Sequence, residues 1–163
     1  MVEIFDDMKV FNSSKMDSSM WIFTLLFFVI SIGVGSMFIN DMKESPFLAL
    51  PFVILVIVGI CSYLMVPKIL MDKDKIRIKN TFVNIDLPFK NLKSVEIANK
   101  NALNVRTFGI GGVFGNFGYF NGDDTWFVTN GKNKVKLTTT NGKNYMISPE
   151  NPNEFVNLIK NFI

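Results

Sequence analysis

Histidine is absent from the 163-residue sequence, and cysteine occurs once, at Cys61. Without histidine the chain cannot form a Ser-His-Asp or Cys-His catalytic arrangement, and it lacks the commonest general acid–base group. A single cysteine excludes an intramolecular disulfide framework and a Cys/His metal site. Because Cys61 lies within an apolar run, we interpret it as a small hydrophobic residue. The sequence therefore predicts a protein that is not an enzyme and that needs no cofactor and no metal.

Charged residues are also scarce, at 19% of the sequence against 48% hydrophobic residues, and the mean hydropathy is positive. The net charge of +3 is unevenly distributed along the chain. Residues 1–66 carry three basic and six acidic residues, whereas residues 67–163 carry fourteen basic and eight acidic residues. We therefore expect the C-terminal part to be the one that could meet an anionic partner. No feature indicates nucleic-acid binding.

Two uncharged apolar runs account for most of the hydropathy. They are WIFTLLFFVISIGVGSMFI, residues 21–39, and PFLALPFVILVIVGICSYLMV, residues 46–66. A helix of nineteen residues is about 28 Å long, close to the thickness of the hydrocarbon core of a bilayer. A signal peptide is disfavoured because no small-residue cleavage site follows the first run. The sequence predicts a transmembrane helical hairpin at residues 21–66, after an N-terminal tail at residues 1–20.

The lysines and arginines that flank these runs predict an orientation. The connector at residues 40–45 holds one of them, and the segments on the other side of the two runs hold seven. Since basic residues favour the cytoplasmic side, both termini are expected in the cytoplasm. Within the second run, Ser45 and Pro46 are expected to begin the helix and Pro51 to kink it.

Short runs of alternating polarity follow residue 67 and predict strands. They lie at residues 75–79, 82–87, 93–98, 125–129, 134–139 and 143–148. Asn-Gly pairs at residues 130–131 and 141–142 predict hairpin turns. Asn151, Pro152 and Glu154 predict a capped helix start, with Phe155, Leu158, Ile159 and Phe162 on one apolar face. The expected fold class is α+β: the transmembrane hairpin, then a small antiparallel β barrel or sandwich with a C-terminal α-helix.

Residues 67–163 resemble the bacterial pleckstrin-homology-like (PH-like) domains found in small membrane proteins. The similarity lies in RTFG at residues 106–109 and in VTNGKNKVKLTTTNGKNYMISPENPNEFVNLI at residues 128–159, within a strand series that is closed by a helix. ISPENPNEF, residues 147–155, is its most specific part. The resemblance implies a PH-like domain that follows transmembrane helices in a bacterial cell membrane. It implies the fold more than a molecular role.

The segment RTFGIGGVFGNFGYFNGDD, residues 106–124, holds six of the eleven glycines. Its spacing does not match a phosphate-binding loop, because no Lys-Ser or Lys-Thr follows the glycines. Two interpretations stay open: the aromatic side chains cover an open end of the barrel, or they form an exposed loop that contacts a protein partner or the bilayer. The candidate contact residues are Phe108, Phe114, Phe117, Tyr119 and Phe120.

Basic residues alternate along the strand that is expected after the second apolar run. Cations near an anionic leaflet attract it, although the same pattern also suits a solvated strand face with charges that set the topology. Arg106 could bind an anion or hold the glycine-rich segment through backbone carbonyls. The candidate anion or lipid contacts are Lys73, Lys75, Arg77, Lys79 and Arg106.

These observations favour a membrane-anchored, non-enzymatic interaction module. The first hypothesis is that the cytoplasmic domain binds another protein, or a second copy of the chain, through a sheet edge or through the glycine-rich segment. The second is that the domain binds or senses anionic lipid. The third is that the chain is an accessory subunit of a larger membrane complex.

Overall fold

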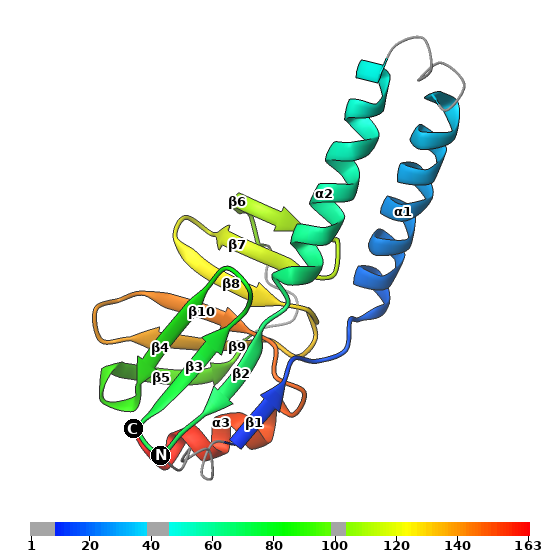
Figure 1. The fold of residues 1–163 in the computed structure, drawn as a ribbon. Helices are drawn as coiled ribbons and strands as arrows, with labels where there is room; N and C mark the ends of the chain where they lie inside the picture. Colours follow the sequence, from blue (N-terminus) through cyan, green and yellow to red (C-terminus); the bar gives the residue numbers. More distant parts are fainter. Residues whose placement is uncertain (1–8, 39–45, 99–103) are drawn as a thin grey trace, which may run out of the picture.

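The computed structural model describes residues 9–38, 46–98 and 104–163. In these residues two β-sheets lie together, and two apolar helices extend away from them on one side (Figure 1). A short C-terminal helix lies at the opposite end of the sheets (Figure 1). The fold is therefore a β-sheet domain with a C-terminal helix and an apolar N-terminal extension.

The first sheet is antiparallel and has the strand order β1-β2-β3-β4. Alternate residues point into the core, and Ile69, Ile76 and Ile78 are almost completely buried there. The strands are β1 (Lys9–Asn12), β2 (Lys68–Met71), β3 (Lys75–Lys79) and β4 (Asn84–Pro88).

Strand β1 comes from the N-terminal tail, for which the sequence predicted no structure. It pairs with β2 in the register Phe11 to Ile69, although both apolar helices lie between the two strands in the sequence. The ring of Phe11 is buried and meets Phe155 edge-on at 5.1 Å between centroids. The chain therefore leaves the first sheet after β1, forms the two apolar helices, and returns to the same sheet as β2, directly beside β1.

The second sheet has the strand order β5-β9-β10-β8-β7-β6. The six strands predicted after residue 67 are all present within one or two residues, and β2, β6 and β7 were missed. The strands are β5 (Leu92–Ile97), β6 (Arg106–Gly111), β7 (Asn116–Phe120), β8 (Asp124–Val128), β9 (Val135–Thr139) and β10 (Asn144–Ile147), with the 3-10 helix η3 (Phe89–Asn91) before β5.

Two expectations about this sheet were wrong. Strand β10 lies between β8 and β9 and runs parallel to β8, so the strands are not all antiparallel. The Asn-Gly pair at 141–142 does join a hairpin, but the pair at 130–131 does not. Its groups bind the segment before the first helix: Asn130 Nδ2 donates to the Lys15 carbonyl at 2.9 Å, and Gly131 N donates to Asp17 at 2.7 Å.

The core lies between the two sheets and the C-terminal helix. Completely buried side chains from both sheets and this helix form one cluster, which includes Ile69, Leu137, Ile147 and Phe155. Burial of each such side chain contributes about 1.5–3 kcal/mol relative to its exposure. The sheets are not closed into a barrel, because within residues 9–38, 46–98 and 104–163 they have four and six strands and no strand pair joins them. The two-sheet arrangement follows the sandwich alternative of the sequence analysis.

Helix α3 (Pro152–Lys160) begins at the predicted proline and buries Phe155 and Ile159. The predicted capping box is absent, because the Asn151 side chain makes no capping hydrogen bond. The Glu154 carboxylate accepts one hydrogen bond from the Lys9 ammonium of β1 and another, at 3.5 Å, from Asn151 Nδ2. An interaction across 145 residues of sequence thus adds to the local contact at this helix start.

The two apolar helices are α1 (Ser18–Phe38) and α2 (Leu50–Leu64), and the 3-10 helix η2 (Pro46–Ala49) precedes α2. By length and composition, α1 is the one helix in the described ranges that could cross a membrane, and α2 has only fifteen residues. A second span is therefore not found by this criterion. Pro51 lies in the first turn of α2, so it begins this helix and does not kink it. Ser45 and the connector at residues 40–45 lie outside the described residues.

Helices α1 and α2 lie side by side (Figure 1) and touch at small residues. A Cβ atom on Gly35 would lie 2.9 Å from the ring of Phe52, and one on Gly59 would lie 3.2 Å from the ring of Phe27. Glycine at these two places therefore lets each helix accept an aromatic ring from the other.

Candidate functional site

The glycine-rich segment forms strands β6 and β7 and the turn between them. Gly109 and Gly118 lie opposite each other in the two strands, with φ angles of +124° and +120°. A Cβ atom on Gly109 would overlap the carbonyl oxygen of Phe117, and one on Gly118 would overlap that of Phe108. The two strands can approach in this way only because both positions are glycine. The aromatic side chains between these glycines then point in different directions.

Two of the five aromatic candidates are core residues. Phe117 is completely buried in the cluster between the sheets. Phe120 points to the opposite face of the second sheet, where it stacks on Trp126 with 4.4 Å between ring centroids. Neither side chain is available to a bilayer or to a partner. The sequence did not reveal this burial on two faces. The neighbouring strand β8 is apolar on both faces, so its pattern does not distinguish a buried face from an exposed one.

Phe114 has a role that neither interpretation of the sequence included. Its ring meets Tyr63 of α2 edge-on at 5.4 Å between centroids and Phe28 of α1 at 6.1 Å. The hydroxyl of Thr24 in α1 accepts a hydrogen bond from Phe114 N at 3.0 Å and donates to the Gly112 carbonyl at 3.3 Å. The β6–β7 turn therefore packs against both apolar helices and joins the sheet domain to them.

Phe108 and Tyr119 are the exposed members of the aromatic set, at 74% and 45% of their full accessible surface. They are partners in the β6–β7 register, so they lie on the same face. Val105, just before β6, is 71% exposed. Strand β6 ends the second sheet, and its outer side pairs with no strand of the described ranges. We refer to Val105, Phe108, Tyr119 and the outer side of β6 as the β6 edge.

The basic candidates on β3 are largely neutralised. Lys75 Nζ and Arg77 Nε each lie 2.6 Å from a carboxylate oxygen of Asp86 on β4. The hydrogen bond from Arg77, followed by that from Lys75, lowers the pKa of the Asp86 carboxyl to about 2. Lys79 is exposed at the end of the same strand, and Lys73 lies in the turn before it. The strand therefore presents a paired charge network and no continuous basic strip.

Arg106 lies far from that network, on β6 of the other sheet. It lines a pocket of about 360 Å³ together with Met20 and Phe23 from the first turns of α1. A Cβ atom on Gly111 would lie 2.8 Å from the Arg106 guanidinium, which therefore packs across the β6 backbone. The structure does not bring the five basic candidates together.

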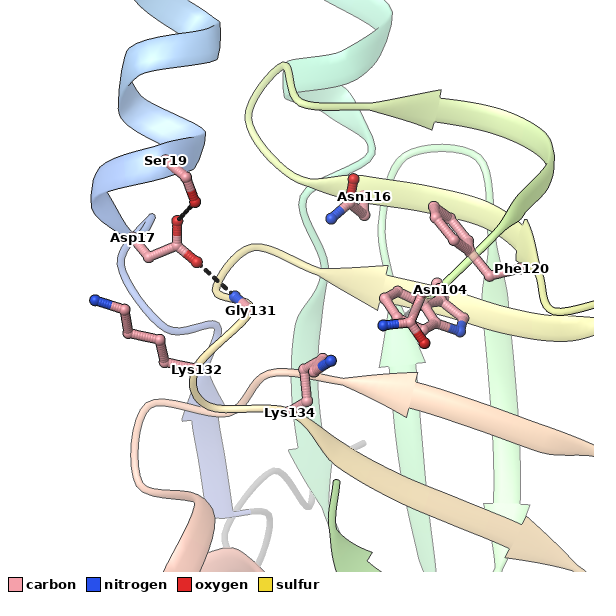
Figure 2. Close-up of a pocket in the computed structure, with 9 residues that line it drawn as sticks. Asp17, Ser19, Asn104, Asn116, Phe120, Gly131, Lys132 and Lys134 are labelled. Carbon is pink, nitrogen blue, oxygen red and sulfur yellow. Dashed lines mark hydrogen bonds between the residues drawn. The ribbon is translucent and has the colours of Figure 1, made fainter. Parts of the chain in front are cut away.

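A larger polar pocket that the sequence did not predict lies between the start of α1, strands β7 and β8, and the turn at residues 130–134. Figure 2 shows Asp17, Asn116 and Lys134 around this pocket, whose volume is about 520 Å³. Its residues are distant in the sequence: Asp17 comes from the N-terminal tail, Asn116 and Phe120 from the glycine-rich segment, and Gly131 from an Asn-Gly pair. The one hint of this pocket in the sequence is Lys134, within the polar stretch GKNKV. Nothing in the sequence indicates that this lysine is buried.

Asp17 closes one side of this pocket and joins α1 to the sheet domain. Its Oδ1 accepts hydrogen bonds from Ser19 Oγ at 2.6 Å and Met20 N at 3.0 Å, which caps the helix. Its Oδ2 accepts a hydrogen bond from Gly131 N at 2.7 Å (Figure 2). Burial raises the pKa of the Asp17 carboxyl, but these hydrogen bonds outweigh burial, so the pKa is below its ordinary value.

Lys134 lies on another side of the pocket and is only 4% exposed. Its ammonium nitrogen is 5.4 Å from the centroid of the Trp126 ring, and within the described ranges it forms no ion pair. Burial lowers the pKa of this amine, because an apolar environment disfavours the charged form.

The two sheets and the closing helix α3 are the elements of a PH-like domain. A family model described as Bacterial PH domain matches residues 67–163. Because this match covers more than half of the chain, the chain belongs to the bacterial PH domain family. Searches of curated proteins and of solved structures gave no significant match. Membership of this family suggests a module that interacts with protein or lipid. Strand β1 and helices α1 and α2 lie outside the matched range.

Proposed function

We propose that this chain is a membrane-anchored, non-enzymatic module whose PH-like domain binds a protein partner on the cytoplasmic side of a bacterial membrane. The observation that carries the proposal is the β6 edge, where exposed apolar side chains lie beside an unpaired strand. Exposed apolar surface beside an open strand edge is typical of sites that accept a strand from another chain.

The pairing of β1 with β2 supports membrane anchoring with two spans. The two strands are neighbours in one sheet, so the chain must leave and re-enter on the same side of any membrane that it crosses. If α1 crosses, the segment that contains α2 must cross back. Helix α1 is about 31 Å long, and η2 with α2 reaches about 30 Å, which are both sufficient for the hydrocarbon core.

The surface of the two helices supports the same proposal. Side chains such as Ile22, Leu25 and Ile32 of α1 and Ile57 of α2 are more than half exposed. Apolar side chains in such numbers are stable in lipid and unfavourable in water. The seven basic residues on the side of the termini, against one in the connector, favour a cytoplasmic domain.

A protein partner suits the β6 edge better than the bilayer does. The outer N–H and C=O groups of an edge strand lose their hydrogen bonds in hydrocarbon, and each loss is costly. A strand from a partner, or β6 from a second copy of the chain, would pair with these groups while its side chains cover Phe108 and Tyr119. The Asp86 network also weakens the case for lipid binding through β3, since it occupies both Lys75 and Arg77.

Photo-crosslinking tests this proposal in the full chain within bacterial membranes. Benzoylphenylalanine replaces Phe108 in one variant and Phe82 in a matched control, because Phe82 is 56% exposed but precedes β4 in the other sheet. We expect a discrete protein adduct from position 108 that is absent from position 82 and weakened by Tyr119→Asp. The mass of the adduct distinguishes a second copy from a different protein. Equal adducts at both positions, or adducts with lipid alone, would contradict the proposal.

A further inference from the structure

Lys134 is an unusual residue in the described part of the chain because it is a buried cation without a carboxylate partner. Its neighbours hold its backbone firmly, since its carbonyl accepts a hydrogen bond from Ala98 N at 2.9 Å and β9 starts at the next residue. Lysine is rarely buried unless it is paired, because an ammonium group that leaves water must be stabilised by an anion or by acceptors. The Trp126 ring stabilises it only in part.

Trp126 provides a second donor without an acceptor at the same place. This side chain is 2% exposed, and its Nε1 forms no hydrogen bond with any group in the described residues. Phe120 stacks on the ring and holds it in position. Buried polar groups are almost always hydrogen-bonded, so an unpaired donor requires an explanation. The Nε1 atom is itself enclosed by protein, so of these two groups the Lys134 ammonium is the one that can reach a ligand in the pocket.

The remaining walls supply further donors and one carboxylate. Figure 2 shows the amide of Asn116 facing the same space, whereas the ammonium group of Lys132, another residue of the lining, points away from it. Asp17 is the acidic residue in the wall, but its two oxygens accept three hydrogen bonds from Ser19, Met20 and Gly131. Asp17 forms no ion pair with Lys134.

We propose that this pocket binds an oxyanion of the phosphate class, with Lys134 as the charged donor and the amide of Asn116 as a neutral donor. A tetrahedral oxyanion has several acceptor oxygens that point in different directions, so it can accept from the Lys134 ammonium and from a neutral donor in the wall at once. This inference is independent of the proposed protein partner, because the β6 edge contributes no residue to the pocket.

The phosphate group has two natural sources: inorganic phosphate or the headgroup of an anionic phospholipid. The pocket includes Asp17 and Ser19 at the first turn of α1. If α1 crosses the bilayer, this turn lies at the level of the headgroups of the cytoplasmic leaflet. The arms of the experiment therefore separate the two sources.

The first arm titrates inorganic phosphate into the full chain in a maltoside detergent, which contains no phosphate. Calorimetry measures binding, and the fluorescence of Trp126 is followed in a Trp21→Phe background. We expect saturable binding that Lys134→Met weakens by about tenfold or more and that Lys132→Met weakens less. Lys93→Met is the matched control, because it removes one exposed lysine from β5 and should bind as the unmodified chain does.

The second arm compares the melting temperature of the full chain in nanodiscs of phosphatidylcholine with that in nanodiscs containing phosphatidylglycerol. A Lys134-dependent rise with phosphatidylglycerol assigns the site to a lipid headgroup, and binding in the first arm alone assigns it to free phosphate. Lys134→Met should fold, since an apolar side chain of similar length replaces a buried charge. The proposal is overturned if neither arm shows an effect, or if Lys134→Met and Lys93→Met respond alike. Crosslinking at position 108 should stay unchanged in Lys134→Met.

Discussion

At the residue scale, the glycines of the β6–β7 pair differ in what surrounds them. Gly109 has a φ angle of +124°, and a Cβ atom there would overlap the Phe117 carbonyl. Gly122 also has a positive φ, +99°, but no atom lies within 4 Å of its Cβ position. Both positions are strained for any other residue, whereas only Gly109 is also blocked by backbone that cannot move aside.

We therefore expect Gly109→Ala to be more destabilising than Gly122→Ala. Backbone strain alone lowers the free energy of unfolding by about 1–3 kcal/mol in both variants. The overlap at Gly109 adds about 1–3 kcal/mol. Urea unfolding of the full chain in maltoside detergent measures the difference between the two variants. Equal losses would mean that the two strands separate easily and that the close approach is not required.

Asp86 makes a contribution to stability that depends on pH. Its carboxyl has a pKa of about 2 in the folded chain because of Arg77 and Lys75, and its ordinary value is 3.8. A lowered pKa stabilises the fold above the ordinary value, and this stabilisation is lost as the pH falls from about 4 to about 2. Since the side chain is 38% exposed, solvent screening limits the contribution to about 1 kcal/mol or less.

The corresponding prediction is that Asp86→Asn lowers the free energy of unfolding at pH 7 by at most about 1 kcal/mol. The difference from the unmodified chain should disappear near pH 2. Unfolding curves between pH 2 and pH 7 measure it, and Asp123→Asn in an exposed turn serves as the control. A difference that grows toward low pH would contradict the assigned ion pairs.

At the element scale, the sequence predicted six strands and helix α3 from alternation, Asn-Gly turns and the helical apolar stripe. It missed β2 because KILM directly follows an apolar run, and β6 and β7 because glycine obscures their alternation. It gave the turn at residues 130–131 the wrong role, because Asp17 and Lys15 bind that turn from more than one hundred residues away. Local patterns therefore predicted local elements, and long-range hydrogen bonds decided how the elements pair.

The same limit applies to the candidate site. Composition and alternation could suggest that the glycine-rich segment carries function, but they could not sort its aromatic residues. Phe114 and Phe120 are fixed by contacts with α1, α2 and Trp126, and Phe108 is exposed because β6 ends the sheet. Lys134 was not predicted, because its burial depends on how β8 and β9 lie around the pocket. Such properties follow from strand order, which one sequence does not determine.

The contact between α1 and the β6–β7 turn gives a prediction at this scale. Thr24→Val removes the acceptor for Phe114 N and the donor to the Gly112 carbonyl, and it keeps nearly the same volume. An amide left without a partner costs about 1–3 kcal/mol, so the turn should open more often. Hydrogen–deuterium exchange in nanodiscs should become faster at residues 112–115. Thr24→Ser retains the hydroxyl and should stay close to the unmodified chain, and equal exchange in both variants would show that the hydroxyl does not hold the turn.

At the scale of the whole molecule, one sheet contains the segments before and after the two apolar helices. The family match begins at residue 67, yet the first sheet is completed by β1, which lies before α1. Phe11 of β1 adds its ring to the core cluster between the sheets. Removing residues 1–66 would therefore remove a strand of the first sheet as well as the two helices. The first sheet therefore holds together the two chain segments that flank the pair of helices.

This topology gives the last prediction. Because β1 pairs with β2, the connector between the helices must lie on the opposite side of the membrane from the domain if α1 spans it. In a Cys61→Ala background, Lys43→Cys should react with a membrane-impermeant maleimide in intact cells. Lys132→Cys, in the domain, should react only after permeabilisation. If both positions react only after permeabilisation, the helices do not cross, and their exposed apolar side chains must be covered on the cytoplasmic side by another protein. The β1–β2 pair excludes a single crossing by α1 alone, so a two-span anchor and a peripheral module are the outcomes that this measurement distinguishes.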